Sequence, residues 1–151
     1  MILSDDKDHI QLQTYLNVKQ YAPIKKRWIT SNDPEEYLRE HILIGDQSDG
    51  IANFLSRDDV FLVTGVRQTP IRKAKLEVWK KYTDPKEFCD EQMLRGYMRN
   101  KQLIDYSCIP EDLKTEIRAA YNSQLGKDRS KLFNYFIEHK LKNLMSDITS
   151  F

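Results

Sequence analysis

Two short acidic segments hold the carboxylates whose spacing is best suited to binding a metal ion. Asp6 and Asp8 follow an apolar segment that we expect to end a β-strand, and side chains at the end of a strand lie where α/β sheets bind ligands. Asp46 and Asp49 lie between two glycines in a predicted turn. Carboxylate oxygens of this kind suit Mg²⁺ or Mn²⁺. Taken singly, each segment is more typical of an ordinary turn or helix cap, and neither has the ligand alternation of an EF-hand.

A basic segment provides a second candidate site. Residues 67–81 contain six Lys or Arg residues and one Glu. They overlap a glycine-containing loop, residues 64–70, and free backbone amides at the start of a helix favour phosphate groups. A solvated helix face explains these charges equally well. Residues 1–50 hold 6 basic and 9 acidic side chains and the rest hold 18 and 14, so the net charge of +1 conceals an acidic end and a basic body.

The other reactive residue types show no catalytic pattern. His9, His41 and His139 are isolated from any Ser or Cys nucleophile pattern, and we expect them to be surface or helix residues. Cys89 and Cys108 lack the spacing of a zinc site and are too few for a disulfide framework, which predicts two partly buried thiols.

The composition predicts one soluble domain, because 40% of the 151 residues are hydrophobic and 31% are charged. The sequence holds no apolar segment of membrane-spanning length and no N-terminal signal peptide. We therefore expect a cytoplasmic location and no membrane partner.

Helical periodicity predicts a mostly helical chain from residue 33 onward. Before it we expect the last residues of a strand and a short hairpin within residues 17–30. Residues 57–70 read as a loop with an apolar insert at 60–63. The predicted helices, three of which begin at a proline, cover residues 34–44, 71–82, 85–103, 110–121 and about 128–145.

Taken in order, these motifs resemble those of one enzyme family. Residues 4–12 read S-x-D-x-D-x-x-Q-L, as in the 5′-nucleases of the flap endonuclease and 5′-3′ exonuclease family. Residues 45–51 resemble the same family's motif G-D-x-x-D-N-(I/V), with Gly50 in place of the usual Asn. Shorter segments between residues 17 and 123 look like counterparts in the bacteriophage branch of the family. The resemblance covers residues 3–151.

The resemblance implies metal-dependent cleavage of phosphodiester bonds. In this family two divalent ions, Mg²⁺ or Mn²⁺, activate a water molecule and stabilise the leaving oxygen. The role that the resemblance implies is removal of RNA primers or 5′ flaps during phage DNA replication, in the host cytoplasm. By the motif match, the metal ligands and catalytic residues are Asp6, Asp8, Asp46 and Asp49.

The resemblance also implies a mainly α fold. Residues 33–151 would form a helical DNA-binding subdomain with a helix-three-turn-helix motif, and residues 1–32 a remnant of the α/β catalytic domain with its strand stub and hairpin. In the family this motif grips duplex DNA by its backbone and reads structure more than sequence. The implied contacts to branched or nicked duplex DNA, or to an RNA–DNA hybrid, come from Gly65, Arg67, Arg72, Lys73 and Lys75.

Two departures from the family pattern shape what we expect. The hairpin at residues 64–70 holds one glycine where the family is glycine-rich, and the family's N-terminal half has no counterpart in this sequence. We therefore expect the C-terminal portion of a phage-type 5′-nuclease, inactive without a complementary N-terminal polypeptide. A single-stranded-DNA-binding protein is a further expected partner. The alternative is a non-catalytic, structure-specific DNA-binding module.

Overall fold

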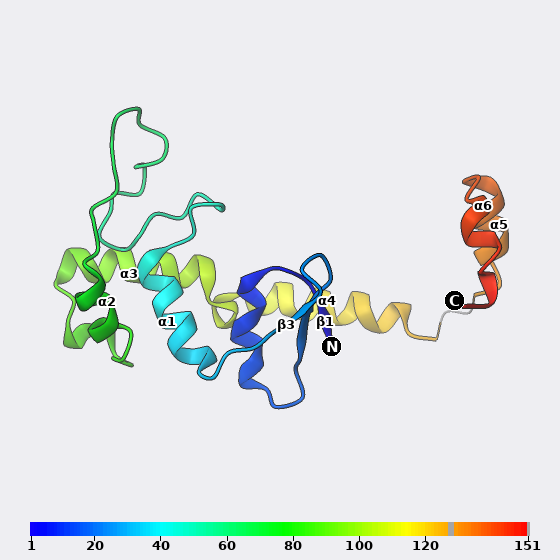
Figure 1. Cartoon of the computed structure of the whole chain (residues 1–151), viewed down its shortest axis with the longest axis horizontal. Coiled ribbons are helices and arrows are strands. Elements are labelled where there is room, and N and C mark those ends of the chain that lie inside the picture. The colour runs from blue at the N-terminus through cyan, green and yellow to red at the C-terminus, as the bar shows by residue number, and fades with distance from the viewer. Residues whose placement is uncertain (127–128, 151) are drawn as a thin grey trace. The chain divides into compact units, whose positions relative to one another are not determined.

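A computed structural model describes residues 1–126 and 129–150, and it confirms the predicted mainly α fold (Figure 1). The chain divides into two units, one from Met1 to Ile109 and one that begins at Pro110. The boundary predicted at residue 33 separates functional subdomains and stays a prediction. Among the described residues, no helix combines the length and the apolar character needed to cross a bilayer.

A three-stranded sheet opens the first unit, with the strand order β1 (Ile2–Leu3), β2 (Gln20–Ala22), β3 (Arg27–Ile29). β1 pairs in parallel with β2, and β2 pairs antiparallel with β3, so the predicted strand end and hairpin are both present. The connection between β1 and β2 contains the 3₁₀ helix η1 (Lys7–Thr14). The Gln20 side chain donates to the carbonyls of Ser4 (3.0 Å) and Asp6 (2.6 Å), which fixes the first acidic segment to the sheet.

Helix α1 (Pro34–Ile44) has the predicted ends. The Asp33 carboxylate caps it by accepting from the Glu36 amide at 2.7 Å, and Pro34 occupies the first turn. Gly45 ends it with a φ of 70°, in the left-handed region that favours glycine. A Cβ atom on Gly45 would also collide with the backbone carbonyl of Ile51, so the chain reverses there only with glycine.

The remaining helices of this unit are α2 (Lys73–Trp79) and α3 (Glu91–Ile104), followed by the 3₁₀ turn η3 (Tyr106–Cys108). The hydrophobic core lies between α1, α3 and the loop that follows α1, with Phe54 at its centre. Gly96 lets α3 approach this loop closely, because a Cβ atom there would overlap the carbonyl of Phe54.

The predicted start of α3 at residue 85 is wrong. Asp84 caps only a 3₁₀ turn, η2 (Pro85–Glu87), and α3 begins after Asp90, whose carboxylate accepts from the Met93 amide at 2.8 Å. The interruption comes from Phe88, which leaves helical geometry with a φ of −135° and stacks its ring on that of Trp79 at 5.7 Å. Burial of the two rings outweighs the continuation of the helix.

The second unit contains α4 (Glu111–Gln124), α5 (Leu132–Glu138), α6 (Lys142–Met145) and the turn η4 (Ile148–Ser150). A single helix over residues 128–145 was expected, and its predicted start at Asp128 lies outside the described residues. The prediction is wrong between α5 and α6, because Lys140 has a φ of 54°. The Leu141 amide then donates to the Phe136 carbonyl at 2.9 Å, which turns the chain over the buried Phe136 ring.

Candidate functional site

The fold brings one aspartate from each acidic segment to the two sides of the His41 ring. The Nδ1 atom of His41 lies 3.5 Å from an Asp8 carboxylate oxygen, and its Nε2 atom lies 3.2 Å from an Asp46 carboxylate oxygen. One ligand atom of each of these three residues lies within 4.8 Å of the other two. Two carboxylates and an imidazole at this spacing can bind a divalent cation.

The other two predicted ligands, Asp6 and Asp49, lie beside this group. The Asp6 carboxylate caps η1 by accepting from the Asp8 amide at 3.0 Å, and the Asp49 amide approaches the Asp46 carboxylate at 3.4 Å. Burial raises the pKa of Asp8, His41 opposes that rise, and the charges of Asp6, Asp46 and Asp49 add to it. The four carboxylates thus share one electrostatic neighbourhood, and a cation there would relieve their mutual repulsion.

Asp46 differs from Asp8 because its charge is well satisfied. The Ser48 hydroxyl and amide both donate to one of its carboxylate oxygens, and His41 contacts the other oxygen. These hydrogen bonds, that of the Ser48 hydroxyl above all, lower the pKa of Asp46 despite its partial burial. Asp46 is therefore ionised and held in one orientation.

The substitution in the second motif has a structural explanation. Gly50 has a φ of 75°, in the left-handed region. Asn is one of the few other residues that adopt this conformation at low cost, so Gly and Asn are interchangeable here. The departure from the family motif thus preserves the turn that carries Asp46 and Asp49.

Sequence reasoning did not assign His41 to the site. Helical spacing put it on the same face as Leu38 and Ile42, and the structure shows it on that face with only 7% of its surface exposed. A hollow of about 190 Å³ opens beside it, lined in part by Tyr37 and Lys7. The sequence signal that could have identified His41 is its position, as a titratable residue, on the apolar face of the predicted helix.

Two buried amides that the sequence analysis also missed hold the acidic segments against α3. Gln11, on η1, donates to the Ile104 carbonyl at 3.0 Å and accepts from the Tyr106 amide at 2.9 Å. Asn100 of α3 donates to the carbonyls of Ile42 and Ala52, each at 2.8 Å. Because η1 carries Asp8 and α1 carries His41, these bonds fix the distance between the two halves of the site.

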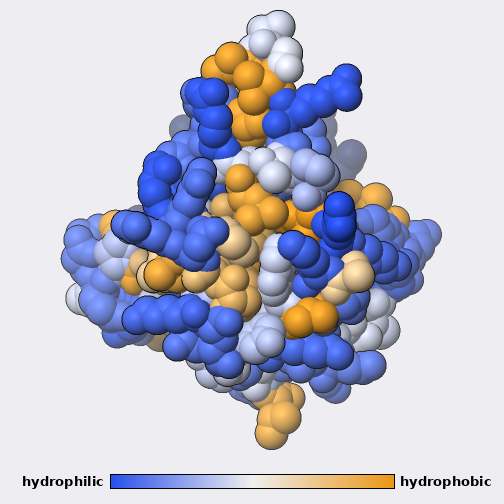
Figure 2. Space-filling view, turned by 90° about the vertical axis from the view of Figure 1, so that its left-hand side faces the viewer, coloured by the Kyte–Doolittle hydropathy of each residue, from blue (hydrophilic) through white to orange (hydrophobic). Residues whose placement is uncertain are grey.

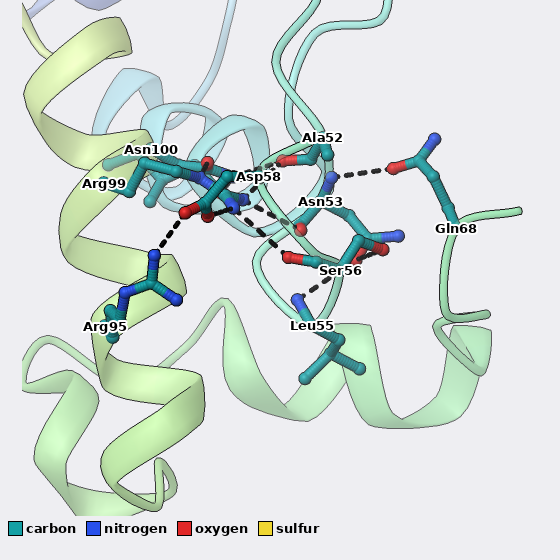
Figure 3. Close-up of polar contacts among 10 residues, drawn as sticks. Ala52, Asn53, Leu55, Ser56, Asp58, Gln68, Arg95, Arg99 and Asn100 are labelled. Atoms are coloured by element: carbon teal, nitrogen blue, oxygen red, sulfur yellow. Dashed lines mark hydrogen bonds and ion pairs between the residues drawn. The ribbon is translucent and has the colours of Figure 1, made fainter. Parts of the chain in front are cut away.

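Hydrogen bonds from Arg99 of α3 hold the loop that follows the second acidic segment against α3 (Figure 3). Its guanidinium donates to the carbonyls of Ala52, Asn53 and Ser56 at 3.0 to 3.2 Å. It also pairs with Asp58 at 2.6 Å, and Arg95 pairs with the same carboxylate. Five-donor arginine is suited to such a cluster of carbonyls.

Hydrogen bonds join the two ends of the loop that runs from α1 to α2. The Asn53 amide donates to the Gln68 side chain at 2.7 Å, and the Asn53 side chain donates to the Thr69 carbonyl at 2.9 Å. The Thr69 amide in turn donates to the Ser56 hydroxyl at 2.9 Å. Between these attachments, Val60 is buried, whereas the apolar side chains at 61–63 and Gly65 are exposed.

The basic residues predicted to bind DNA are exposed on this loop and on α2. Arg67 follows Gly65, whose φ is 83°, while Arg72 precedes α2 and Lys73 and Lys75 lie within it. Within the described part of the chain, none of these four cationic side chains forms an ion pair. Figure 2 shows that hydrophilic side chains surround a smaller apolar area on this face of the molecule.

Lys80 belongs to the same basic segment, but its ammonium group is already paired and is not free to bind a phosphate. Its ammonium lies 3.0 to 3.3 Å from the carboxylates of Glu36, Glu40 and Glu77. The hydrogen bonds to Glu77 and Glu40 raise the pKa of Lys80 well above its usual value. The candidate DNA surface is therefore smaller than the charge count of the sequence indicated.

Comparison with known proteins identifies the family of this chain. The family described as T4 RNase H, C terminal, matches residues 32–151. The ribonuclease H of Enterobacteria phage T4 is 32% identical over 156 aligned positions, which cover 100% of this chain and 51% of that protein. The chain thus spans about half the length of this relative. The match confirms the resemblance to the phage branch, and the chain belongs to the T4 RNase H C-terminal family.

Proposed function

We propose that this chain forms the C-terminal part of a metal-dependent 5′-nuclease that hydrolyses phosphodiester bonds, removing RNA primers or 5′ flaps in phage DNA replication. The observation that carries the proposal is the convergence of the two acidic motifs on one group of ligand atoms, in which His41 is buried and Asp8 and Asp46 are partly buried. Nothing in local chain geometry requires segments 38 residues apart to bring like charges together, and a bound cation supplies the reason.

In this proposal, Asp6, Asp8, Asp46 and Asp49 hold Mg²⁺ or Mn²⁺, two ions in the complete site. When bound, the ions activate a water molecule and stabilise the leaving oxygen. The Ser48 hydroxyl and the sheet-bound Gln20 keep the acidic segments in place. Since the relative is about twice as long, we infer that further ligands come from the other half of the nuclease, on the same or a separate polypeptide.

The substrate in this proposal is branched or nicked duplex DNA, or an RNA–DNA hybrid, in the host cytoplasm. Gly65, Arg67, Arg72, Lys73 and Lys75 contact phosphates and place the scissile bond near the aspartates. Such contacts confer no sequence preference, as a structure-specific nuclease requires. A single-stranded-DNA-binding protein is a further proposed partner.

The test combines this chain with a polypeptide carrying the other half of the family's nuclease, Mg²⁺ and a labelled 5′-flap DNA. We expect cleavage by the mixture and a loss of at least about 100-fold with Asp46→Asn, since one carboxylate ligand is removed. The matched control, Asp112→Asn, changes an exposed aspartate of the second unit and should retain full activity.

The second candidate, a non-catalytic DNA-binding module, predicts a different result. Flap DNA would then bind equally well with or without Mg²⁺, with unchanged affinity in Asp46→Asn, and no mixture would cleave it. That combination of results would remove the catalytic proposal. The observation that favours this alternative is that Lys73 and Lys75 of α2 are exposed and form no ion pair with the described residues.

A further inference from the structure

The two ring nitrogens of His41 have different partners. Nε2 lies 3.2 Å from one Asp46 carboxylate oxygen, and the other oxygen of that carboxylate accepts from the Ser48 amide. Nδ1, the other ring nitrogen, faces Asp8.

The contact between Nδ1 of His41 and Asp8 does not have hydrogen-bond geometry. At 3.5 Å it is longer than the usual 2.7 to 3.2 Å of an N–H···O bond. The His41 side chain is only 8% exposed, which limits solvation of this pair by water. A cation between the two atoms would contact both of them.

The same distance fits two ligands of one metal ion. Two metal–ligand bonds of about 2.1 Å that meet near the tetrahedral angle span about 3.4 Å. The Asp46 carboxylate orients the ring through Nε2, as carboxylates commonly do for metal-bound histidines. The Tyr37 ring packs edge-on at 5.9 Å and further limits rotation of the imidazole. His41 is thus oriented for binding before a metal arrives.

We propose that His41 is a metal ligand through Nδ1, together with Asp8, and that the site favours transition-metal ions such as Mn²⁺, Co²⁺ or Zn²⁺ over Mg²⁺. Imidazole nitrogen suits these metals, whereas Mg²⁺ prefers oxygen ligands alone. This inference rests on the metal site proposed above and adds a nitrogen donor to its carboxylates.

The experiment is an electron spin-echo envelope modulation spectrum of Mn²⁺ bound to this chain, with Mn²⁺ and Mg²⁺ affinities measured by titration. We expect ¹⁴N modulation from a directly bound imidazole, converted to a ¹⁵N pattern when the histidines are ¹⁵N-labelled. His41→Gln should abolish the modulation and weaken Mn²⁺ binding about 10- to 100-fold, with a much smaller effect on Mg²⁺. The control His139→Gln, in the second unit, should match the unsubstituted chain in both measurements.

Several results would overturn the inference. They are bound Mn²⁺ without nitrogen modulation, modulation that survives His41→Gln, or Mn²⁺ binding no tighter than in Asp8→Asn. The spectrum of the unsubstituted chain decides the matter even if His41→Gln fails to fold. Mn²⁺ held by oxygen alone would leave the nuclease proposal intact. By contrast, unchanged metal binding and cleavage in Asp8→Asn and Asp46→Asn would end that proposal itself.

Discussion

At the scale of single residues, buried polar side chains hold the acidic segments of the candidate site in position, and these side chains are harder to recognise in the sequence than the aspartates. The aspartates were found from the sequence because their types and spacing match a motif. Asn100 and Gln11 were not recognised from the sequence, because an isolated amide side chain in a helical pattern is usually a surface residue. The position of Asn100 three residues after Tyr97 and four before Ile104, both buried, was the signal that could have identified it.

We predict that Asn100→Ala destabilises the first unit by about 2 to 4 kcal/mol, since the carbonyls of Ile42 and Ala52 lose their donor inside the protein. Chemical denaturation monitored by circular dichroism measures this change. Gln102→Ala, at an exposed position of the same helix, is the matched control and should lie within about 0.5 kcal/mol of the unsubstituted protein. Equal effects of the two substitutions would show that the buried bonds carry little stability.

Cys89 gives a prediction that depends on pH. Burial raises the pKa of the Cys89 thiol to about 11, and the charge of Asp90 adds to the rise. In a Cys108→Ser background, alkylation near pH 8 should be about 100-fold slower in the folded protein than in denaturant, because less thiolate is present. The stabilising effect of the protonated thiol is complete below the pKa of the unfolded chain and is lost as the pH rises through about 11. Equal alkylation rates in the folded and unfolded protein would show that the Cys89 thiol is not buried.

At the scale of elements, the sequence predicted those helices whose ends are set by local chemistry. Asp33 and Pro34 define the start of α1, and Gly45 defines its end, as expected. The start of α3 was missed because Phe88 stacks on Trp79, the last residue of α2, and helical periodicity does not reveal a contact between two elements. The loop after α1 was recognised as irregular, but its attachment to Arg99 depends on carbonyls that periodicity cannot reveal.

The turn that carries Asp46 gives a prediction at this scale. Gly45→Ala should cost at least about 2 kcal/mol more than Gly50→Ala, although both residues have positive φ. The difference comes from space, because a Cβ atom collides with the Ile51 carbonyl only at Gly45, and no atom lies within 4 Å of one at Gly50. Thermal unfolding of both variants measures it, and Gly50→Asn should be nearly neutral because it restores the usual family residue. Similar losses at the two glycines would show that the Ile51 carbonyl moves aside at little cost.

At the scale of the whole molecule, the net charge of +1 says little, and the pairing of individual charges says more. The basic segment at residues 67–81 looked uniform in the sequence. The structure divides it into exposed cations, such as Arg67 and Lys73, and Lys80, which is paired with three glutamates. The pairs with Glu36 and Glu40 are tertiary contacts, so the sequence could indicate a candidate DNA-binding surface but could not delimit it.

This division predicts unequal effects on DNA binding. Arg67→Ala and Lys73→Ala should each weaken binding to a 5′-flap duplex and reduce the slope of log affinity against log salt by about 0.9, since each removes one phosphate contact. Lys80→Ala should leave the slope unchanged, because its charge is already neutralised by Glu36, Glu40 and Glu77, and should instead lower the unfolding temperature by leaving those carboxylates without a partner. Fluorescence anisotropy over a range of salt concentrations separates the two classes. A salt slope that falls equally in all three variants would mean that the ion pairs of Lys80 open on binding, and that the whole basic segment contacts DNA.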